Sequence, residues 1–149
     1  MFCRLGQGGY GFVVHCRKKS TGMDYAMKIQ LKVGMVETFY DDVSRVVQEK
    51  EAIASVSHPF IISMDYAFQT QSLAMIVMEL GGSGSLKEAL RDRVGHRMTE
   101  DEVRFYSAEI FLALAHIHRL GMIYRDLKPA NVILNNDGHI KLVDLGGII

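Results

Sequence analysis

The sequence is poor in cysteine and has no excess of charge of either sign. Its 149 residues include two cysteines, Cys3 and Cys16, which are too few for a disulfide framework and favour reduced thiols in the cytoplasm. Seventeen basic and seventeen acidic residues give a formal net charge of zero. This balance argues against a protein that binds nucleic acid or a membrane surface through bulk charge.

Long apolar runs, repeats and an amino-terminal signal are missing as well. The best candidate for a membrane span, residues 60–78, is interrupted by Asp65 and several other polar residues. No basic segment followed by an apolar one stands at the amino terminus, so no signal peptide is expected. The remaining composition, 48% apolar and 23% charged, is that of an ordinary globular protein, and the length predicts one domain.

The first motif is a cluster of glycines near the amino terminus. Gly6, Gly8 and Gly11 have the spacing G-x-G-x-x-G, which a dinucleotide-binding turn shares. That turn leads into a helix, whereas residues 12–16 are strand-like, so we predict that the glycines lie at the bend of a β-hairpin. Backbone without side chains can close over phosphates there, although a plain glycine-rich turn is an alternative.

Two charged residues are candidates for the same site. In a predicted strand at residues 25–29, alternation places Lys28 on one face with Ala26, which suits a wall that binds phosphate. An exposed lysine at a strand edge is the alternative. Residues 41–56 have helical spacing, and Glu49 lies on their apolar stripe. A buried carboxylate needs a cationic partner, for which Lys28 is the candidate, unless Glu49 is solvated at the edge of the stripe.

A change in composition divides the chain. Apolar segments at residues 61–68 and 73–80 predict two strands of one antiparallel sheet. Glycines and a serine at residues 81–84 then resemble a linker, after which the sequence becomes helical. We therefore expect an α+β protein, and clefts between two such parts are preferred ligand sites.

The second part is predicted to contain two helices. Residues 85–93 fit a short helix. Thr99 and Glu102 fit a capping box at the start of a longer helix that ends near Arg119. Apolar residues spread nearly all round this longer helix, which indicates a buried central helix.

The strongest constellation lies near the carboxyl end. Asp126, Lys128 and Asn131 lie on one loop, and a predicted hairpin with its turn at residues 136–138 returns the chain to Asp144. Two acids, an amide and a lysine would converge there. This set suits holding a metal-bound polyphosphate while a carboxylate takes the proton of an attacking hydroxyl.

Taken together, these residues resemble the eukaryotic protein kinase family over essentially the whole chain. The motifs are, in order, Gly6-x-Gly8-x-x-Gly11-x-Val13, Ala26-Met27-Lys28, Glu49, Tyr124-Arg125-Asp126-x-Lys128-x-x-Asn131 and Asp144-Leu145-Gly146. Five elements in the right order, each on the expected type of structure, make the match specific. The resemblance implies a bilobal fold with an N-lobe at residues 1–80, a hinge at 81–84 and part of a helical C-lobe at 85–149.

The resemblance also implies roles for these residues. Asp126 would accept the proton of the substrate hydroxyl, Lys128 would neutralise the γ-phosphate, and Asn131 and Asp144 would bind two magnesium ions. Lys28 would contact the ATP phosphates and be held by Glu49. The residues implied in ATP binding are Leu5, Gly6, Gly8, Gly11, Val13, Ala26, Lys28, Met78, Glu79, Gly81, Ser85 and Ile133. The lysine of the loop is typical of serine/threonine kinases, so the implied partner is a protein with a serine or threonine.

Several residues relate the chain to one group of this family. Tyr124 in place of histidine, with Lys128-Pro129 and His58-Pro59-Phe60, is similar to the AGC group, which includes cyclic-nucleotide-dependent and G-protein-coupled-receptor kinases. Leu145 stands where most members have phenylalanine, and Ser85 where many have an acid that binds ribose. The family continues beyond this point with an activation segment and more helices, so we expect an incomplete kinase domain.

Two other functions stay open. One is a catalytically silent module that binds a nucleotide or a partner. The intact charged residues of the motifs disfavour it, and truncation favours it. The other is a small-molecule phosphotransferase of related fold, which Lys128-Pro129 and the strand sequence before Lys28 disfavour.

Overall fold

The structure is a computed structural model that describes residues 4–8, 11–31, 56–82, 84–145 and 148. By its internal contacts the chain divides into two compact units, each described here by itself. The sheet unit comprises Met1–Lys50 and Ser63–Leu80, and the helical unit comprises Glu51–Ile62 and Gly81–Ile149. The predicted helix at residues 41–56, with Glu49, lies almost entirely outside the described residues.

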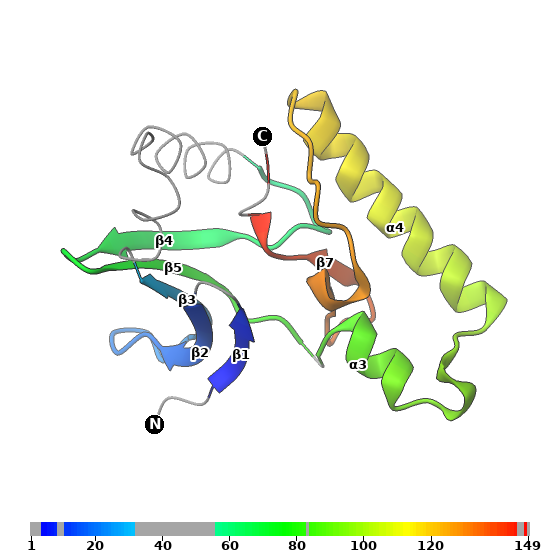
Figure 1. The fold of residues 1–149 in the computed structure, drawn as a ribbon, viewed down its shortest axis with the longest axis horizontal. Coiled ribbons are helices and arrows are strands. Elements are labelled where there is room, and N and C mark those ends of the chain that lie inside the picture. Colours follow the sequence, from blue (N-terminus) through cyan, green and yellow to red (C-terminus); the bar gives the residue numbers. More distant parts are fainter. Residues whose placement is uncertain (1–3, 9–10, 32–55, 83, 146–147, 149) are drawn as a thin grey trace. The chain divides into compact units, whose positions relative to one another are not determined.

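One antiparallel sheet of five strands forms the described part of the sheet unit (Figure 1). The strands are β1 (Arg4–Gly8), β2 (Gly11–Arg17), β3 (Asp24–Leu31), β4 (Met64–Gln69) and β5 (Leu73–Glu79), in the order β1-β2-β3-β5-β4. β-Branched and aromatic residues favour these strands, and a tight turn joins β4 to β5 through a bond from the Thr70 amide to the Leu73 carbonyl at 2.9 Å.

The strand register places the predicted cleft residues on one face of the sheet. Val13 lies opposite Lys28, which lies opposite Ile76, and Ala26 lies opposite Met78. Residues directly opposite each other in a ladder share a face, so these five side chains line the same side. The predicted alternation in β3 is therefore confirmed.

The described part of the helical unit contains two α-helices, two short 3-10 helices and a hairpin (Figure 1). These are α3 (Leu86–Arg91), η1 (Val94–His96), α4 (Glu100–Arg119), η2 (Pro129–Asn131), β6 (Val132–Leu134) and β7 (Ile140–Leu142). The predicted capping box of Thr99 and Glu102 is confirmed at the start of α4. A second capping box, which was not predicted, joins Ser85 and Glu88 at the start of α3.

The segment before β4 does not belong to the sheet, so the predicted strand at residues 61–68 is wrong in its first part. β4 begins at Met64. Ile61 and Ile62 are buried and run parallel to β7 instead. The Leu142 amide donates to the Phe60 carbonyl at 2.8 Å, and the Ile62 amide donates to the Leu142 carbonyl at 2.9 Å. These bonds explain why the residues before Ser63 group with the helical unit.

Helix α4 is not buried on all sides in the structure, which corrects the prediction of a central helix. Its buried residues are Glu109, Ala113 and Ile117, which lie four apart and form one stripe. Phe111 and Leu112 are 68% and 50% exposed. Among the described residues the helix therefore packs through one face, and several of its other large apolar side chains are exposed.

Candidate functional site

Two predicted catalytic residues, Asp126 and Lys128, and the predicted metal ligand Asn131 converge in the helical unit. Lys128 Nζ donates to both carboxylate oxygens of Asp126, at 3.0 and 2.7 Å. Asn131 Nδ2 donates to the carbonyl and to Oδ2 of Asp126, both at 2.9 Å. The loop that carries all three residues is short, so the acid is fixed from two sides without help from distant elements.

These contacts keep the Asp126 carboxyl ionised. The hydrogen bond from Lys128 lowers the pKa of Asp126 most, and the bond from Asn131 adds to this effect. The carboxylate is half-exposed, since 45% of its side-chain surface is open to solvent. An ionised, accessible carboxylate is the state that a proton acceptor requires.

The hairpin brings the position of Asp144 next to Asn131, as the sequence predicts. Asn131 is buried at the entrance of β6, and its carbonyl accepts from the Val143 amide at 3.0 Å. Val132 lies opposite Leu142 in the ladder. Asp144 is thus the next residue after Val143, whose amide is hydrogen-bonded to Asn131.

Two residues of this region have left-handed backbone. Arg125 has a φ of 62° and Asp144 a φ of 58°. Such conformations are worth about 1–3 kcal/mol of strain for residues other than glycine, and they cluster at active sites.

Tyr124 connects the loop to the end of β7. Its ring is 1% exposed, and its hydroxyl donates to the Val143 carbonyl, one residue before Asp144. Burial raises the pKa of the Tyr124 hydroxyl, and the nearby charges of Asp144 and Asp126 raise it further. The hydroxyl therefore stays protonated and can serve as a donor.

Replacing Tyr124 with phenylalanine should lower the free energy of unfolding by about 1–3 kcal/mol, because the part-buried Val143 carbonyl loses its donor. Chemical denaturation would measure the change. Tyr25→Phe is a control, since the Tyr25 ring is also buried, whereas the partners given for its hydroxyl among the described residues are side chains, Met23 Sδ at 3.9 Å and Tyr66. Equal effects of the two variants would contradict this role of Tyr124.

Part of the predicted ATP site also comes together in the helical unit. A Cβ added to Gly81 would lie 2.8 Å from the Ile133 side chain, and Ser85 forms an isolated bridge with Ile133. The Leu134 amide donates to the Gly84 carbonyl at 2.9 Å. The segment after Leu80 therefore runs beside β6, with the predicted adenine and ribose residues in contact.

The Ser85 hydroxyl already has partners. It donates to Glu88 Oε2 at 2.9 Å and accepts from the Glu88 amide at 3.3 Å, and the residue is 8% exposed. The hydrogen bonds from Ser85 lower the pKa of Glu88. The Ser85 hydroxyl thus serves as the N-cap of α3.

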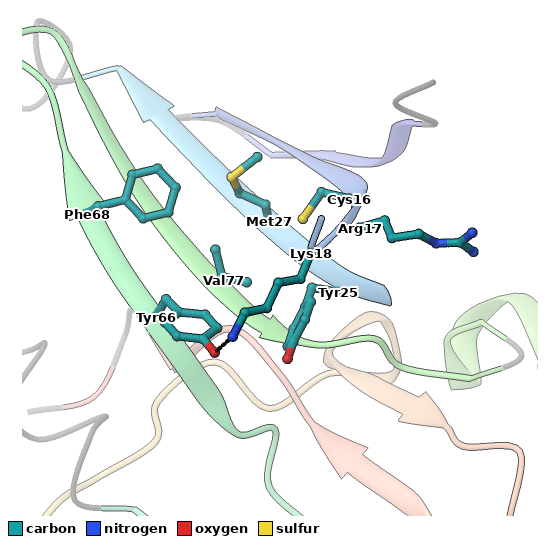
Figure 2. Close-up of a pocket in the computed structure, with 8 residues that line it drawn as sticks. All are labelled: Cys16, Arg17, Lys18, Tyr25, Met27, Tyr66, Phe68 and Val77. Carbon is teal, nitrogen blue, oxygen red and sulfur yellow. Dashed lines mark hydrogen bonds between the residues drawn. The ribbon is translucent and has the colours of Figure 1, made fainter. Parts of the chain in front are cut away.

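The sheet unit holds the remaining predicted ATP-site residues. Leu5, Gly6 and Gly8 lie in β1, and Met78 and Glu79 end β5. A Cβ on Gly11 would lie 2.0 Å from the Ile29 carbonyl oxygen, so only glycine allows this approach of β2 to β3. Gly6 has open space around it. The opposite face of the sheet carries a shallow apolar hollow of about 410 Å³ (Figure 2), lined by Cys16, Arg17, Lys18, Tyr25, Met27, Tyr66, Phe68 and Val77.

The sequence analysis overlooked a buried acid in α4. Glu109 is 5% exposed; Oε2 accepts from the Ile140 amide at 2.9 Å, and Oε1 lies 2.5 Å from His139 Nδ1. Its position four residues before Ala113, on the stripe that packs inward, is a signal that could have identified it. It joins α4 to the hairpin that carries the site.

Comparison with known proteins identifies the family. The model of the protein kinase domain matches residues 2–148, so the chain belongs to the protein kinase family. Its antiparallel sheet followed by helices agrees with that fold. Among the described residues, no helix combines the length and apolar character needed to cross a membrane.

Several curated relatives are similar to the chain over 95% of its length. The RAC family serine/threonine-protein kinase homolog of Dictyostelium discoideum is 41% identical over 142 residues. The RAC serine/threonine-protein kinase of Drosophila melanogaster and the human ribosomal protein S6 kinase alpha-2 are each 43% identical, over 143 and 145 residues. The chain spans 31%, 23% and 19% of these relatives, respectively. The resemblance to serine/threonine kinases of the AGC group is confirmed.

Proposed function

We propose that this chain forms part of the catalytic domain of a protein kinase that transfers the γ-phosphate of ATP to a serine or threonine of a protein. The observation that carries the proposal is the convergence of Asp126, Lys128 and Asn131 at the base of the hairpin that leads to Asp144. Family membership and the named relatives support it.

The residues of the helical unit would do the chemistry. Asp126, held ionised by Lys128, would orient the hydroxyl of the protein substrate and accept its proton as the oxygen attacks. While the substrate hydroxyl gives its proton to Asp126, Lys128 would stay close to the reacting phosphate. Tyr124 and Asn131 would position this loop against the strand that leads to Asp144.

The donor set fits a magnesium ion. Both bonds from the Asn131 side chain to Asp126 use its nitrogen, so the amide oxygen is the atom suited to a metal. A carboxylate and an amide oxygen are the hard ligands that magnesium prefers, and the ion keeps positions for phosphate. Magnesium-bound ATP would supply the transferred group and positive charge around it.

The sheet unit would hold the nucleotide. Lys28 would bind phosphate, with Glu49 as its ion-pair partner, beneath backbone from Gly6 to Gly11. Val13, Ala26 and Met78, which share the Lys28 face, would contact the adenine with Leu5 and Glu79. From the helical unit, Gly81 and Ile133 are assigned to the adenine and Ser85 to the ribose. We assign residues 1–80 to the N-lobe, 81–84 to the hinge and 85–149 to part of the C-lobe.

The direct test is transfer of labelled phosphate from ATP to protein and peptide substrates, with the protein in its natural length. We expect label on serine or threonine and none on tyrosine. Magnesium-dependent ATP binding without transfer would support the silent module instead. Transfer to small molecules alone would support the phosphotransferase.

Lys128→Ala should move the acidic limb of the pH–rate profile to higher pH. Lys128 is the main cause of the lowered pKa of Asp126, so its removal raises that pKa and the carboxylate is protonated at a higher pH. The measurement is kcat against pH, with Lys87→Ala as a control because Lys87 is an exposed lysine outside the loop. An unmoved limb in Lys128→Ala would contradict the assigned role.

We also propose a cytoplasmic location. Two cysteines are too few for a disulfide framework, and Cys16 is a free thiol. Fractionation of cells that express the protein would test it, and recovery from the secreted fraction would contradict it.

A further inference from the structure

A row of five aromatic rings joins three elements of the helical unit. In order, the row contains His116, His58, Phe60, His139 and Phe105. Neighbouring ring centroids lie 5.0, 5.5, 5.8 and 5.8 Å apart. His116 and Phe105 come from α4, His139 from the turn before β7, and the other two from the segment before Ile61.

The His58 end of the row is arranged for a neutral imidazole. The Phe60 amide donates to His58 Nδ1 at 3.2 Å, so this nitrogen acts as an acceptor and carries no proton. Adding a proton to Nδ1 would break that bond. Among the described residues, His116 Nε2 is buried and has no hydrogen-bond partner, so the ring beside His58 offers it no acceptor from this atom's neighbours.

The charges around His58 act in the same direction. Burial lowers the pKa of His58 most, and His116, Arg119 and Lys141 lower it further through positive charge. Among the described residues these are the titratable groups that face His58: two from α4 and one from β7.

The His139 end responds in the opposite way. His139 Nδ1 lies 2.5 Å from Glu109 Oε1, and the hydrogen bond with this buried acid raises the pKa of His139. The Asp137 carboxylate raises it further, while burial opposes the change. Proton uptake therefore strengthens this contact.

The segment between the two ends supports the strand that leads to Asp144. The backbone bonds of Phe60 and Ile62 to Leu142 add this segment to the side of β7, and β7 ends two residues before Asp144. The turn at His58 anchors this added segment through two bonds: the Phe60 amide donates to His58 Nδ1 at 3.2 Å, and the Ile61 amide donates to the His58 carbonyl at 3.1 Å.

We propose that His58 is a proton-operated latch on β7: the neutral imidazole holds the Phe60 amide, and protonation at Nδ1 releases it, which leaves the turn with the Ile61–His58 backbone bond alone while the Glu109–His139 contact stays closed. At low pH the segment of Phe60 to Ile62 then loosens from β7, whereas the contacts of Glu109 in α4 with His139 and Ile140 remain.

The direction of the pH dependence follows from the difference in the pKa of His58 between the closed and open turns. In the open state His58 is hydrated and has an ordinary pKa of about 6.5, whereas the closed state favours the neutral ring. Stability of the closed turn is complete above that value and falls as the pH drops below it. The ratio of open to closed turns should rise by up to about tenfold for each pH unit in this range.

NMR titration of the imidazole resonances in the unmodified protein is the first test. We expect the His58 midpoint below about 6.5 and the His139 midpoint above it. His116→Phe retains a ring and removes a charge, so it should raise the His58 midpoint, whereas His118→Asn, at an exposed position on the same helix, should leave it unchanged. A His58 midpoint at or above 6.5 would overturn the proposal.

Amide hydrogen exchange is the second test, with each rate divided by its intrinsic value at the same pH. Protection of the Phe60 and Leu142 amides should fall between pH 7 and pH 5.5, at most about tenfold, while that of Ile140 is retained. His58→Asn supplies an acceptor that does not titrate, so this variant should keep its protection. Acid-induced loss of protection that persists in His58→Asn would refute the latch.

Discussion

Asp126→Ala should lower kcat for phosphate transfer by about 10²–10⁴-fold, the usual contribution of a positioned proton acceptor. Lys128 and Asn131 hold this carboxylate ionised and in place, and no other acid of the loop can replace it. Asp126→Asn is the sharper variant because it keeps the size of the side chain and its contact with Lys128 while removing the negative charge.

The measurement is steady-state transfer to a serine or threonine peptide, with ATP affinity measured in parallel. Asp101→Asn is a matched control, since the Asp101 side chain is 92% exposed and lies at the start of α4. Both Asp126 variants should retain ATP binding. A rate for Asp126→Asn within a few-fold of the unmodified protein would exclude this residue as the proton acceptor.

Ile117→Ala should lower the free energy of unfolding by about 2–5 kcal/mol, because Ile117 is fully buried on the packed face of α4 and the change leaves a cavity. Phe111→Ala, on the same helix and 68% exposed, should change it by less than about 0.5 kcal/mol. Urea unfolding of the chain of residues 1–149 measures both. Similar losses would show that α4 packs all round, as the sequence pattern first indicated.

Features set by neighbouring residues were predictable from the sequence. The capping box at Thr99 depends on a partner three residues away, and the β6–β7 hairpin depends on a turn of three residues. The alternation that places Ala26 and Lys28 on one face follows from strand geometry alone. These predictions needed no knowledge of tertiary contacts, and they include the loop of Asp126, Lys128 and Asn131.

Features that depend on distant contacts were not predictable in the same way. Thirty residues separate Glu109 from His139, and a lone acid in an apolar helix does not show what it binds. Ile61 and Ile62 are as apolar as a strand of the main sheet, and only the position of β7 shows which neighbour they choose. The capping box of Ser85 and Glu88 is different: it spans three residues, as that of Thr99 does, so the sequence pattern could have revealed it.

The path of the chain between its two units limits how it can be cut. The backbone leaves the sheet unit before residue 56, lies along β7 up to Ile62, and returns to form β4. A gene split at Gly81 would therefore place Ile61 and Ile62 on one polypeptide and their pairing partner Leu142 on the other. Expression of contiguous halves would yield two products, each with an unpaired surface, that regain their native pairing only by complementation.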